Sequence, residues 1–313
     1  MSNIARVSGY AHLTTDDLVP PDSPHVFFDP ADTETGVWVA NDLLTDGCSV
    51  LDLGSGSGAA AAAMVRAGAA RVHGVDAGAE SVAWAMEHYA SPRTDPRVTV
   101  AQGDFSELST NELLATAPTP LGRPIIVTST LPYVPLPEQV NGQRRSIAGG
   151  DDGLKWAPTV IRHARSLGSD LGLSIASYSS PRRALRLLRS AGYRVESVTL
   201  AALPLGEFTL QHSERVLALE ETGEAVLWRT GGGPTRYFIL GLACRWVGAE
   251  DPLEEGRLTG DMLLRLLRVA ARSRTGALEA LDERGASDWS GTTGWSGPVR
   301  VLDLPPAPVR QHC

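Results

Sequence analysis

Short apolar runs alternate with helical patterns along most of the chain, from about Val50 to Trp246. Apolar runs of roughly four to eight residues bounded by turn residues indicate buried strands, whereas longer segments with one apolar face indicate helices. Strands are expected at residues 49–53, 71–75, 97–101, 124–129 and 171–177, with a closing pair at 193–200 and 237–244. Helices are expected at residues 59–67, 81–89, 157–166 and 181–191.

This alternation predicts an α/β fold with a doubly wound, mostly parallel sheet of seven strands in residues 45–246. Residues 1–44 form an N-terminal segment that could act as a lid, with Phe27 and Phe28 over the pocket. Residues 205–233 form an insert with an amphipathic pattern, too long for a hairpin turn, and connections of this length are often functional.

The C-terminal extension, residues 247–313, is expected to be helical at 257–284 and irregular in its final Gly-, Ser- and Pro-rich stretch, 285–313. Leucines at helical spacing mark the helical part: Leu263, Leu264, Leu266 and Leu267. Such a stripe favours packing onto the sheet domain or onto a second copy of the chain over a role in ligand binding. A homodimer through these helices is therefore one arrangement that the sequence leaves open.

Composition and charge exclude several classes of function. A chain of 313 residues, 42% of them hydrophobic, can bury a sizeable core. The formal net charge of -8 disfavours general nucleic-acid binding, which needs a basic surface. The arginine run at 182–189 is typical of a solvated helix face. No stretch approaches the roughly 20 apolar residues of a membrane span, and three distant cysteines show no metal-ligand spacing. We expect a cytoplasmic protein without a metal site.

The stretch VLDLGSGSG at residues 50–58 ends a predicted strand in a glycine turn. Gly54, Gly56 and Gly58 let the backbone turn sharply and approach a ligand, and the next helix presents its N-terminal amides. The spacing of Gly54, Gly56 and Ala59 also satisfies a relaxed dinucleotide fingerprint. The turn alone therefore leaves a nicotinamide-dependent dehydrogenase open.

Aspartates stand at the ends of three successive predicted strands, and they favour a ligand other than a dinucleotide. Asp52 would repel a diphosphate but attract the amino group of an amino-acid moiety, and Asp76 is placed to accept hydrogen bonds from ribose hydroxyls. Asp104 could accept from an adenine amino group, with Phe105 packing on the ring. Each aspartate alone could be a cap or turn residue. Together they suit S-adenosylmethionine, which carries adenine, ribose and an amino acid but no phosphate.

With these residues in view, the sequence resembles the class I, Rossmann-like methyltransferases, and within them the branch that methylates glutamine amides of peptide-release factors. The resemblance covers about residues 26–200. Four stretches carry it: the DTE of FFDPADTET at 32–34, VLDLGSGSG at 50–58, STLPYVP at 129–135, and AGGDDGLKWAPTVI at 148–161. The third stands where that branch has Asn-Pro-Pro-Tyr, and the fourth resembles its Gly-Gly-x-Asp-Gly-Leu segment.

The resemblance implies a role for each matching residue at an S-adenosylmethionine site. Asp52, Gly54 and Gly56 would line the methionine end, Asp76 would hold the ribose, and Asp104 would hold the adenine. Neighbouring residues of the same motifs are expected at that site: Thr33, Ser55, Ala77, Phe105 and Ser129.

The chain departs from the branch at the residue that would hold the acceptor. The family's asparagine aligns a planar nitrogen for methylation, but Thr130 stands there, followed by Leu131 in place of the first proline. A threonine hydroxyl cannot reproduce the paired groups of an amide. Thr130 therefore argues against glutamine-amide methylation, while Tyr133 could wall the acceptor site or simply pack under the loop.

These features predict a methyltransferase for a small-molecule acceptor, tailoring a secondary metabolite by O-, N- or C-methylation. The protein must align the acceptor with the methyl group and remove a proton where the acceptor carries one. His212 in the insert is the candidate base, with His25 and His163 as weaker alternatives. The other readings are a protein-glutamine or nucleic-acid methyltransferase, an inactive cofactor-fold interaction protein, and the dehydrogenase.

Overall fold

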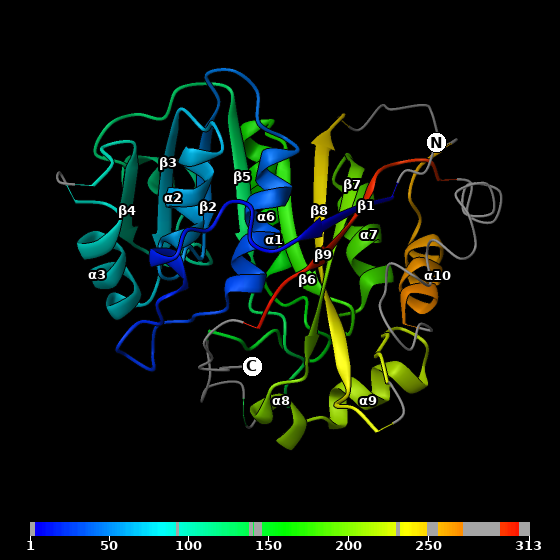
Figure 1. Ribbon diagram of the computed structural model, residues 1–313. Coiled ribbons are helices and arrows are strands. Elements are labelled where there is room, and N and C mark those ends of the chain that lie inside the picture. The colour runs from blue at the N-terminus through cyan, green and yellow to red at the C-terminus, as the bar shows by residue number, and fades with distance from the viewer. Residues whose placement is uncertain are drawn as a thin grey trace.

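The computed structural model describes residues 4–91, 94–137, 140, 146–229, 232–248, 256–271 and 295–306, and the statements below concern these residues. They form one mixed sheet with helices on both faces, its strands in the order β1-β9-β7-β8-β6-β5-β2-β3-β4 (Figure 1). The strands are β1 Ile4–Ser8, β2 Ser49–Leu53, β3 Arg71–Asp76, β4 Val98–Gln102, β5 Ile125–Thr130, β6 Leu171–Ala176, β7 Tyr193–Pro204, β8 Arg236–Trp246 and β9 Val299–Asp303.

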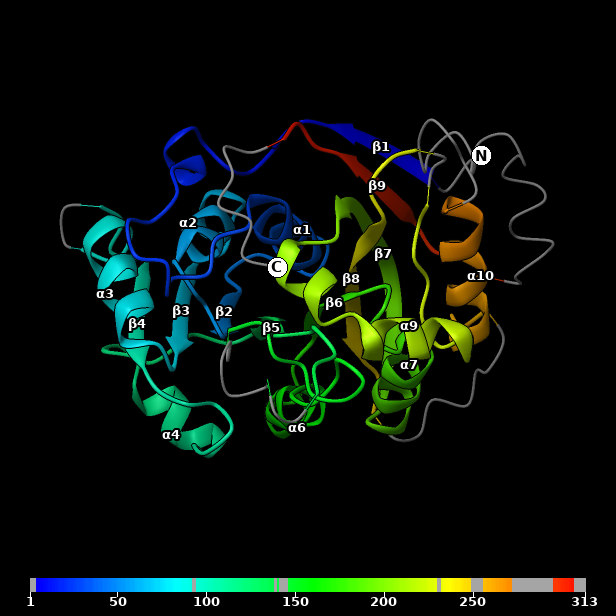
Figure 2. The same cartoon turned by 90° about the horizontal axis from the view of Figure 1, so that it is seen from below.

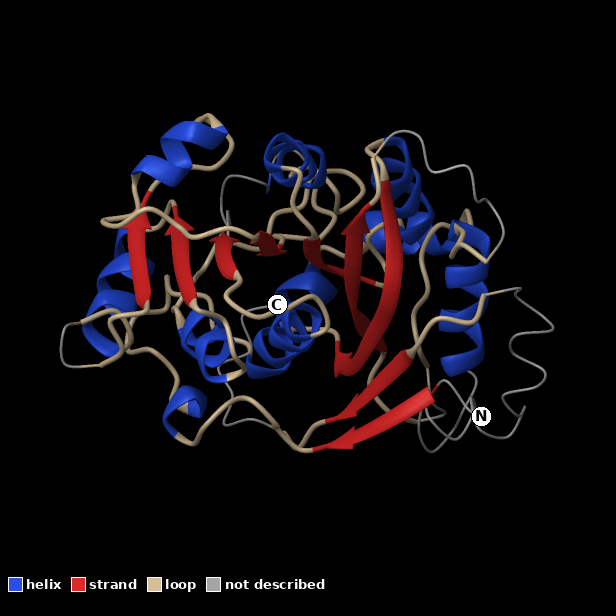
Figure 3. Ribbon diagram, turned by 90° about the horizontal axis from the view of Figure 1, so that it is seen from above, coloured by secondary structure: helices blue, strands red, loops and turns tan. Residues whose placement is uncertain are grey.

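Helices cover the sheet as two layers, which Figures 2 and 3 show from opposite sides. On one face lie α1 Pro30–Asn41, α2 Ala59–Arg66 and α3 Ala79–His88. On the other lie α4 Thr110–Ala115, α6 Ala157–Leu167 and α7 Pro181–Ser190, and α10 Gly260–Ala270 packs against α7. The short helices are η1 Asp16–Leu18, α8 Glu207–Gln211 and α9 Glu214–Glu221. None of these helices has the length and apolar character that crossing a bilayer requires.

All seven predicted strands are present, as β2 to β8. Five of them, β2 to β6, pair in parallel, and β8 runs antiparallel between β6 and β7. The carboxyl ends of β2 to β7 therefore meet at one edge of the sheet, the lower edge in Figure 1. The insert continues from β7 at this edge as α8 and α9, two short helices where a single amphipathic pattern was read.

Two further strands extend the predicted sheet from seven strands to nine. β9 pairs in parallel with β7, and β1 pairs in parallel with β9, with Ile4 opposite Val299. The prediction that the final stretch is irregular is therefore wrong at residues 299–303. Each of these strands is only five residues long, and their mutual pairing joins the two ends of the chain, so no local pattern could reveal it.

The predicted C-terminal helix is present as α10, which begins after the N-cap residue Thr259. Its four leucines are fully buried against the rest of the same chain: Leu263, Leu264, Leu266 and Leu267. Of the two kinds of packing that the leucine stripe left open, the structure shows packing within the chain. The remainder of the predicted helical segment, residues 272–284, lies outside the described residues.

Helix α1 lies unusually close to the middle of the sheet, because glycines stand where the two meet. A Cβ atom on Gly241 of β8 would lie 2.4 Å from Val39 Cγ2, and one on Gly172 of β6 would lie 3.0 Å from Val39 Cγ1. On the helix itself, a Cβ on Gly36 would lie 3.1 Å from Thr130 Oγ1. The N-terminal half of α1 is thereby held against the carboxyl ends of β5 and β6.

Replacing Gly241 with Ala should test this close approach. The added methyl group would overlap both Val39 and Thr35 of α1, so we expect the free energy of unfolding to fall by about 1–3 kcal/mol. Gly122→Ala is the matched control, since its Cβ would meet Ser49 Oγ at an ordinary 3.7 Å. Chemical denaturation measures both variants, and equal stability of the two would contradict the packing argument.

Candidate active site

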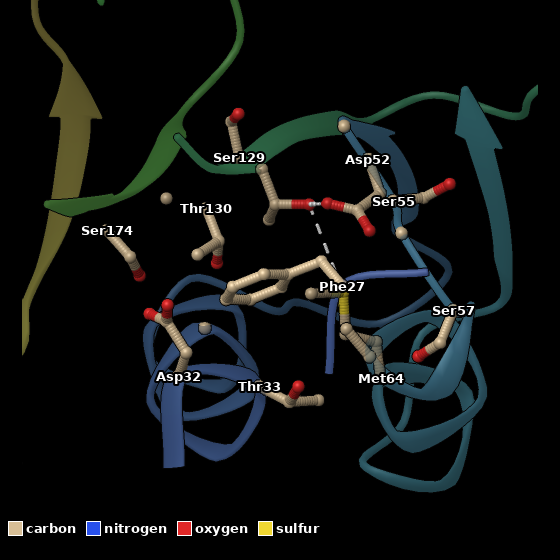
Figure 4. Close-up of a pocket in the computed structure, with 16 residues that line it drawn as sticks. Phe27, Asp32, Thr33, Asp52, Ser55, Ser57, Met64, Ser129, Thr130 and Ser174 are labelled. Carbon is tan, nitrogen blue, oxygen red and sulfur yellow. Dashed lines mark hydrogen bonds between the residues drawn. The ribbon is translucent and has the colours of Figure 1, made fainter. Parts of the chain in front are cut away.

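A cavity opens at the carboxyl edge of the sheet, between the glycine turn after β2, the first turns of α1, and the ends of β5 and β6 (Figure 4). It holds about 580 Å³ of empty space, and this volume includes the part that is open to solvent. Its lining residues are Phe27, Asp32, Thr33, Gly36, Asp52, Gly54, Ser55, Gly56, Ser57, Ala60, Met64, Thr128, Ser129, Thr130, Gly172 and Ser174.

The glycine turn forms one wall of the cavity. Gly54 and Gly56 have φ angles of +77° and +54°, a left-handed conformation that favours glycine. A Cβ on Gly54 would lie 3.8 Å from Phe105 Cε1, and one on Gly56 would lie 4.0 Å from the Phe27 carbonyl oxygen, so the positive φ angles and not steric crowding favour glycine here. Gly54, Ser55 and Gly56, all predicted at the cofactor site, line the cavity.

Asp76 stabilises this turn from the end of β3. Its Oδ2 accepts a hydrogen bond from the Gly56 amide at 2.9 Å, and its Oδ1 accepts one from the Gly78 amide at 2.8 Å. The carboxylate thus lies beside the turn without being part of the cavity lining. Ala77 next to it is exposed, and its carbonyl accepts from Gln102 Nε2 at 3.4 Å.

Asp104 and Phe105 lie beyond the end of β4, two strands from β2 along the same edge. Asp104 Oδ1 accepts hydrogen bonds from the amide and hydroxyl of Ser106, at 2.9 and 2.7 Å. The Phe105 ring packs edge-on against Trp156, with 6.0 Å between the ring centroids. Both residues were predicted to contact adenine, and both lie outside the residues that line the cavity.

Asp52 is a buried carboxylate in the cavity wall. Its Oδ1 accepts a hydrogen bond from Thr128 Oγ1 at 2.8 Å, and no basic side chain lines the cavity near it. Burial, together with the nearby charge of Asp76, raises the pKa of Asp52 to about 6, and the Thr128 hydrogen bond opposes this shift. A cationic amino group bound here would supply the partner that this carboxylate lacks.

The three side chains of the DTE segment of α1, residues 32–34, point to two different places. Asp32 and Thr33 line the cavity, one helical turn before Gly36. Glu34 points elsewhere and accepts hydrogen bonds from the amides of residues 11–13, with His12 Nδ1 2.9 Å from its Oε1. The motif therefore anchors the N-terminal segment and builds the site at once.

Asp32 is the cavity residue with the most unusual surroundings. It is 1% exposed, and its Oδ2 accepts a hydrogen bond from the Tyr133 hydroxyl at 2.7 Å. Among the described residues, no hydrogen-bond donor reaches its Oδ1. Burial and the neighbouring Asp29 carboxylate raise the pKa of Asp32 well above its usual range, although the Tyr133 hydrogen bond opposes this.

The loop after β5 places its predicted residues in different positions. Thr130 lines the cavity, and Ser129 does too, its hydroxyl donating to the Leu53 carbonyl at 2.7 Å. Tyr133 is buried behind the cavity, with its ring packed among Tyr178 and Tyr237. Tyr133 therefore does not wall the cavity, and it reaches the site through its hydrogen bond to Asp32.

The candidate histidines lie outside the cavity lining. His212 ends α8, and its ring packs on Phe208 with centroids 4.7 Å apart. His163 has structural partners, since Nε2 donates to the Phe105 carbonyl and Nδ1 contacts Thr110 Oγ1, both at 2.8 Å. Burial lowers the pKa of His163, and His25 is exposed. The cavity offers a carboxyl group where the sequence suggested a histidine.

Several lining residues carried weak signals in the sequence. Ser174 is a polar residue inside the otherwise apolar β6, and Thr128 begins the polar second half of β5, patterns that could have marked a polar cavity beside the sheet. Phe27 was expected to cover the pocket, and its ring crosses the middle of the cavity in Figure 4. Asp32 was part of a matched motif, but only the packing of α1 turns its side chain into the site.

The polar side chains that line the cavity fit S-adenosylmethionine better than a dinucleotide. Two carboxylates and seven hydroxyl side chains line it, and no lysine, arginine or histidine does. A diphosphate would find no cationic side chain there, whereas an ammonium and a sulfonium would be attracted to Asp52 and Asp32. Gly54 and Gly56 line the same cavity and bring the backbone of the turn close to such a ligand.

Fold and site together have the features of a Rossmann-like methyltransferase domain. Residues 50–116 match the family model described as a methyltransferase domain. This match covers the glycine turn, Asp76 and Asp104. It supports S-adenosylmethionine-dependent methyl transfer as the activity, with S-adenosylmethionine as the methyl donor.

Three solved structures illustrate the similarity in fold. A proposed RNA methyltransferase of Pyrococcus horikoshii is 16% identical, with 77% of this chain and 93% of that chain covered and a TM-score of 0.45. Precorrin-6y C5,15-methyltransferase of Geobacter metallireducens is 12% identical, with 74% and 98% covered and a TM-score of 0.42. The ribosomal protein L11 methylase of Lactobacillus delbrueckii is 14% identical, with 78% and 95% covered and a TM-score of 0.38. No curated protein gave a significant sequence match.

Binding of S-adenosylhomocysteine, the demethylated product, should weaken as the pH falls from about 7 to about 5. Protonation of Asp52 below its pKa of about 6 removes the charge that attracts the amino group, so affinity should fall up to about tenfold per pH unit. Calorimetry on the wild-type chain and on Asp52→Asn measures this, and the variant should bind weakly without that slope. An equal slope in both would assign the effect to another group.

The same pKa shift predicts a change in stability. Because the folded state takes up the Asp52 proton more readily than the unfolded state, Asp52 favours folding below about pH 4 and loses this contribution as the pH rises through about 6. Asp52→Asn should therefore unfold at a higher temperature than the wild type at about pH 7. The difference should shrink towards about pH 4, and thermal melts at both pH values would show it.

Proposed function

We propose that this methyltransferase acts on a small molecule and tailors a secondary metabolite. The carrying observation is that the polar side chains beside Thr130 are buried. Asp32 and Ser174 are each 1% exposed, and Thr130 is partly buried. Groups this buried suit an acceptor small enough to enter the cavity whole, better than an acceptor that is part of a macromolecule.

The chemistry of this end supports the same proposal. Thr130 and Ser174 offer single hydroxyl groups, and no asparagine lines the cavity to hold a planar amide. A macromolecular polyanion also finds little free positive charge on the arginine run. Arg182 pairs with Glu224 and Asp261, and Arg183 pairs with Asp152.

S-Adenosylmethionine supplies an electrophilic methyl group when it is bound, so the residues of this chain mainly bind and align. Asp52 and the Gly54–Gly56 turn would hold the methionine end, and Asp76 would keep that turn in its ligand-accepting shape. Thr130 would orient the acceptor by one hydrogen bond, and Phe27 would exclude water. Such alignment is worth several orders of magnitude in rate.

Labelled S-adenosylmethionine incubated with the chain and a cell extract, then separated by size, tests the acceptor class. We expect label in the small-molecule fraction. Asp76→Ala is the control, since loss of its hydrogen bonds to Gly56 and Gly78 should cut cofactor affinity by about 10–100-fold and remove the label. Label found only in the protein or nucleic-acid fraction would reverse the assignment. Cofactor binding without any label would favour an interaction protein.

A further inference from the structure

Asp32, one of the residues that line the cavity, has a buried hydrogen-bond acceptor without a partner in the described part of the chain. A buried polar atom without a partner costs free energy, and most are therefore paired in native structures. Asp32 Oδ1 has no partner among the described residues, and the helix that carries it is held rigidly against the sheet. An atom kept in this condition at a ligand site indicates that the ligand supplies the missing donor.

The position of Asp32 relative to the other cavity residues narrows what that ligand group is. Asp32 and Gly36 are four residues apart and so share one face of α1. A Cβ on Gly36 would lie 3.1 Å from Thr130 Oγ1 and 4.0 Å from Ser174 Oγ, so both hydroxyls face this side of the helix. In Figure 4 the carboxyl group of Asp32 points toward Thr130 and Ser174. Asp52 lies across the cavity, at the glycine turn.

Two carboxylates at different parts of one cavity suit different tasks. Asp52 adjoins the turn that would take the amino-acid moiety of S-adenosylmethionine. Asp32 adjoins Thr130, the residue at the acceptor position of the loop. A carboxylate in this second position can accept a proton from the acceptor while the methyl group is transferred.

We infer that Asp32 is the general base of this enzyme, and that its acceptor is a hydroxyl or amine that carries a proton into the cavity. This inference rests on the proposed function and specifies its substrate class. The acceptor oxygen or nitrogen forms the new bond to the methyl carbon, and the carbon–sulfur bond breaks with its electron pair left on a neutral thioether. The acceptor's proton moves to Asp32 Oδ1, which balances the charge lost at sulfur. A carboxylate acceptor, which brings no proton and a like charge, does not fit.

The groups around Asp32 determine how strong a base it is. On its own helix the Asp29 carboxylate lies one turn earlier, where it caps α1. From the loop after β5 the Tyr133 hydroxyl donates to Oδ2, and Tyr133 in turn lies 3.3 Å from the Tyr237 hydroxyl of β8. Asp52 faces it across the cavity. Burial and negative neighbours raise the pKa of Asp32, and a base of higher pKa removes a proton more effectively.

Asp32→Asn tests the inference, with the labelled cofactor and extract as the assay. We expect the rate of label transfer to fall about 10²–10⁴-fold, while calorimetry shows S-adenosylhomocysteine bound within a few fold of the wild type. Asp32→Glu should recover part of the rate because it restores a carboxylate. Asp46→Asn, the same exchange at an exposed position before β2, should behave as the wild type.

Stability and pH distinguish a base from a structural residue. Asp32→Asn should melt at or above the wild-type temperature at about pH 7, because it removes a buried carboxylate that lacks a full set of partners. The wild-type rate should rise with pH as Asp32 ionises, and the rate of Asp32→Asn should not show this rise. In Tyr133→Phe the rise should occur at higher pH, since the Tyr133 hydrogen bond lowers the pKa of Asp32.

The outcomes separate this inference from the proposed function. Wild-type transfer by Asp32→Asn, or loss of cofactor binding in proportion to the rate, overturns the role of Asp32 even when a small molecule is labelled. If a macromolecule is labelled instead, and the Asp32→Asn variant labels it as slowly as expected, Asp32 is still the base and the proposed small-molecule acceptor is wrong. A chain that binds S-adenosylhomocysteine but labels neither fraction contradicts both.

Discussion

The close approach of α1 to the sheet is the constraint on which the site depends. Gly172 and Gly241 leave no side chain between the sheet and Val39, and Gly36 lets the helix reach Thr130. One added methyl group at these positions would push the helix outward. The first turns of α1 would then move away from the ends of β5 and β6, and Asp32 and Thr33 would leave the cavity wall.

The cavity concentrates negative charge and hydroxyl groups and has no cationic side chain in its lining. Burial of Asp32 and Asp52 raises the pKa of both carboxyl groups, which is unfavourable for the folded state at neutral pH. A ligand that carries an ammonium and a sulfonium offsets this at binding. The two buried carboxylates therefore lower the stability of the free chain and favour ligand binding and proton transfer, as is common at functional sites.

The two ends of the chain contribute to this arrangement from a distance. β1 and β9 pair with each other and extend the sheet beyond β7, and Arg300 of β9 pairs with Asp42 at the end of α1 and lies over the Trp38 ring at 4.0 Å. Glu34 holds the segment that follows β1. The terminal segments thus fix the helix that carries Asp32, a structural link that the local pattern of either end did not suggest.

Local sequence determined much of this protein. The apolar periodicity of β2 to β8 predicted the parallel sheet, because each strand pattern depends on neighbouring residues. The glycine turn and the carboxylates at the ends of successive strands placed the expected cofactor site at one edge of that sheet, and the resemblance of the loop after β5 made Thr130 the expected acceptor residue. Only the tertiary structure decided that Tyr133 supports Asp32 from behind, that His212 lies outside the cavity lining, and that β1 joins β9. These features depend on contacts between residues tens to hundreds of positions apart, and a local pattern carries no information on such contacts.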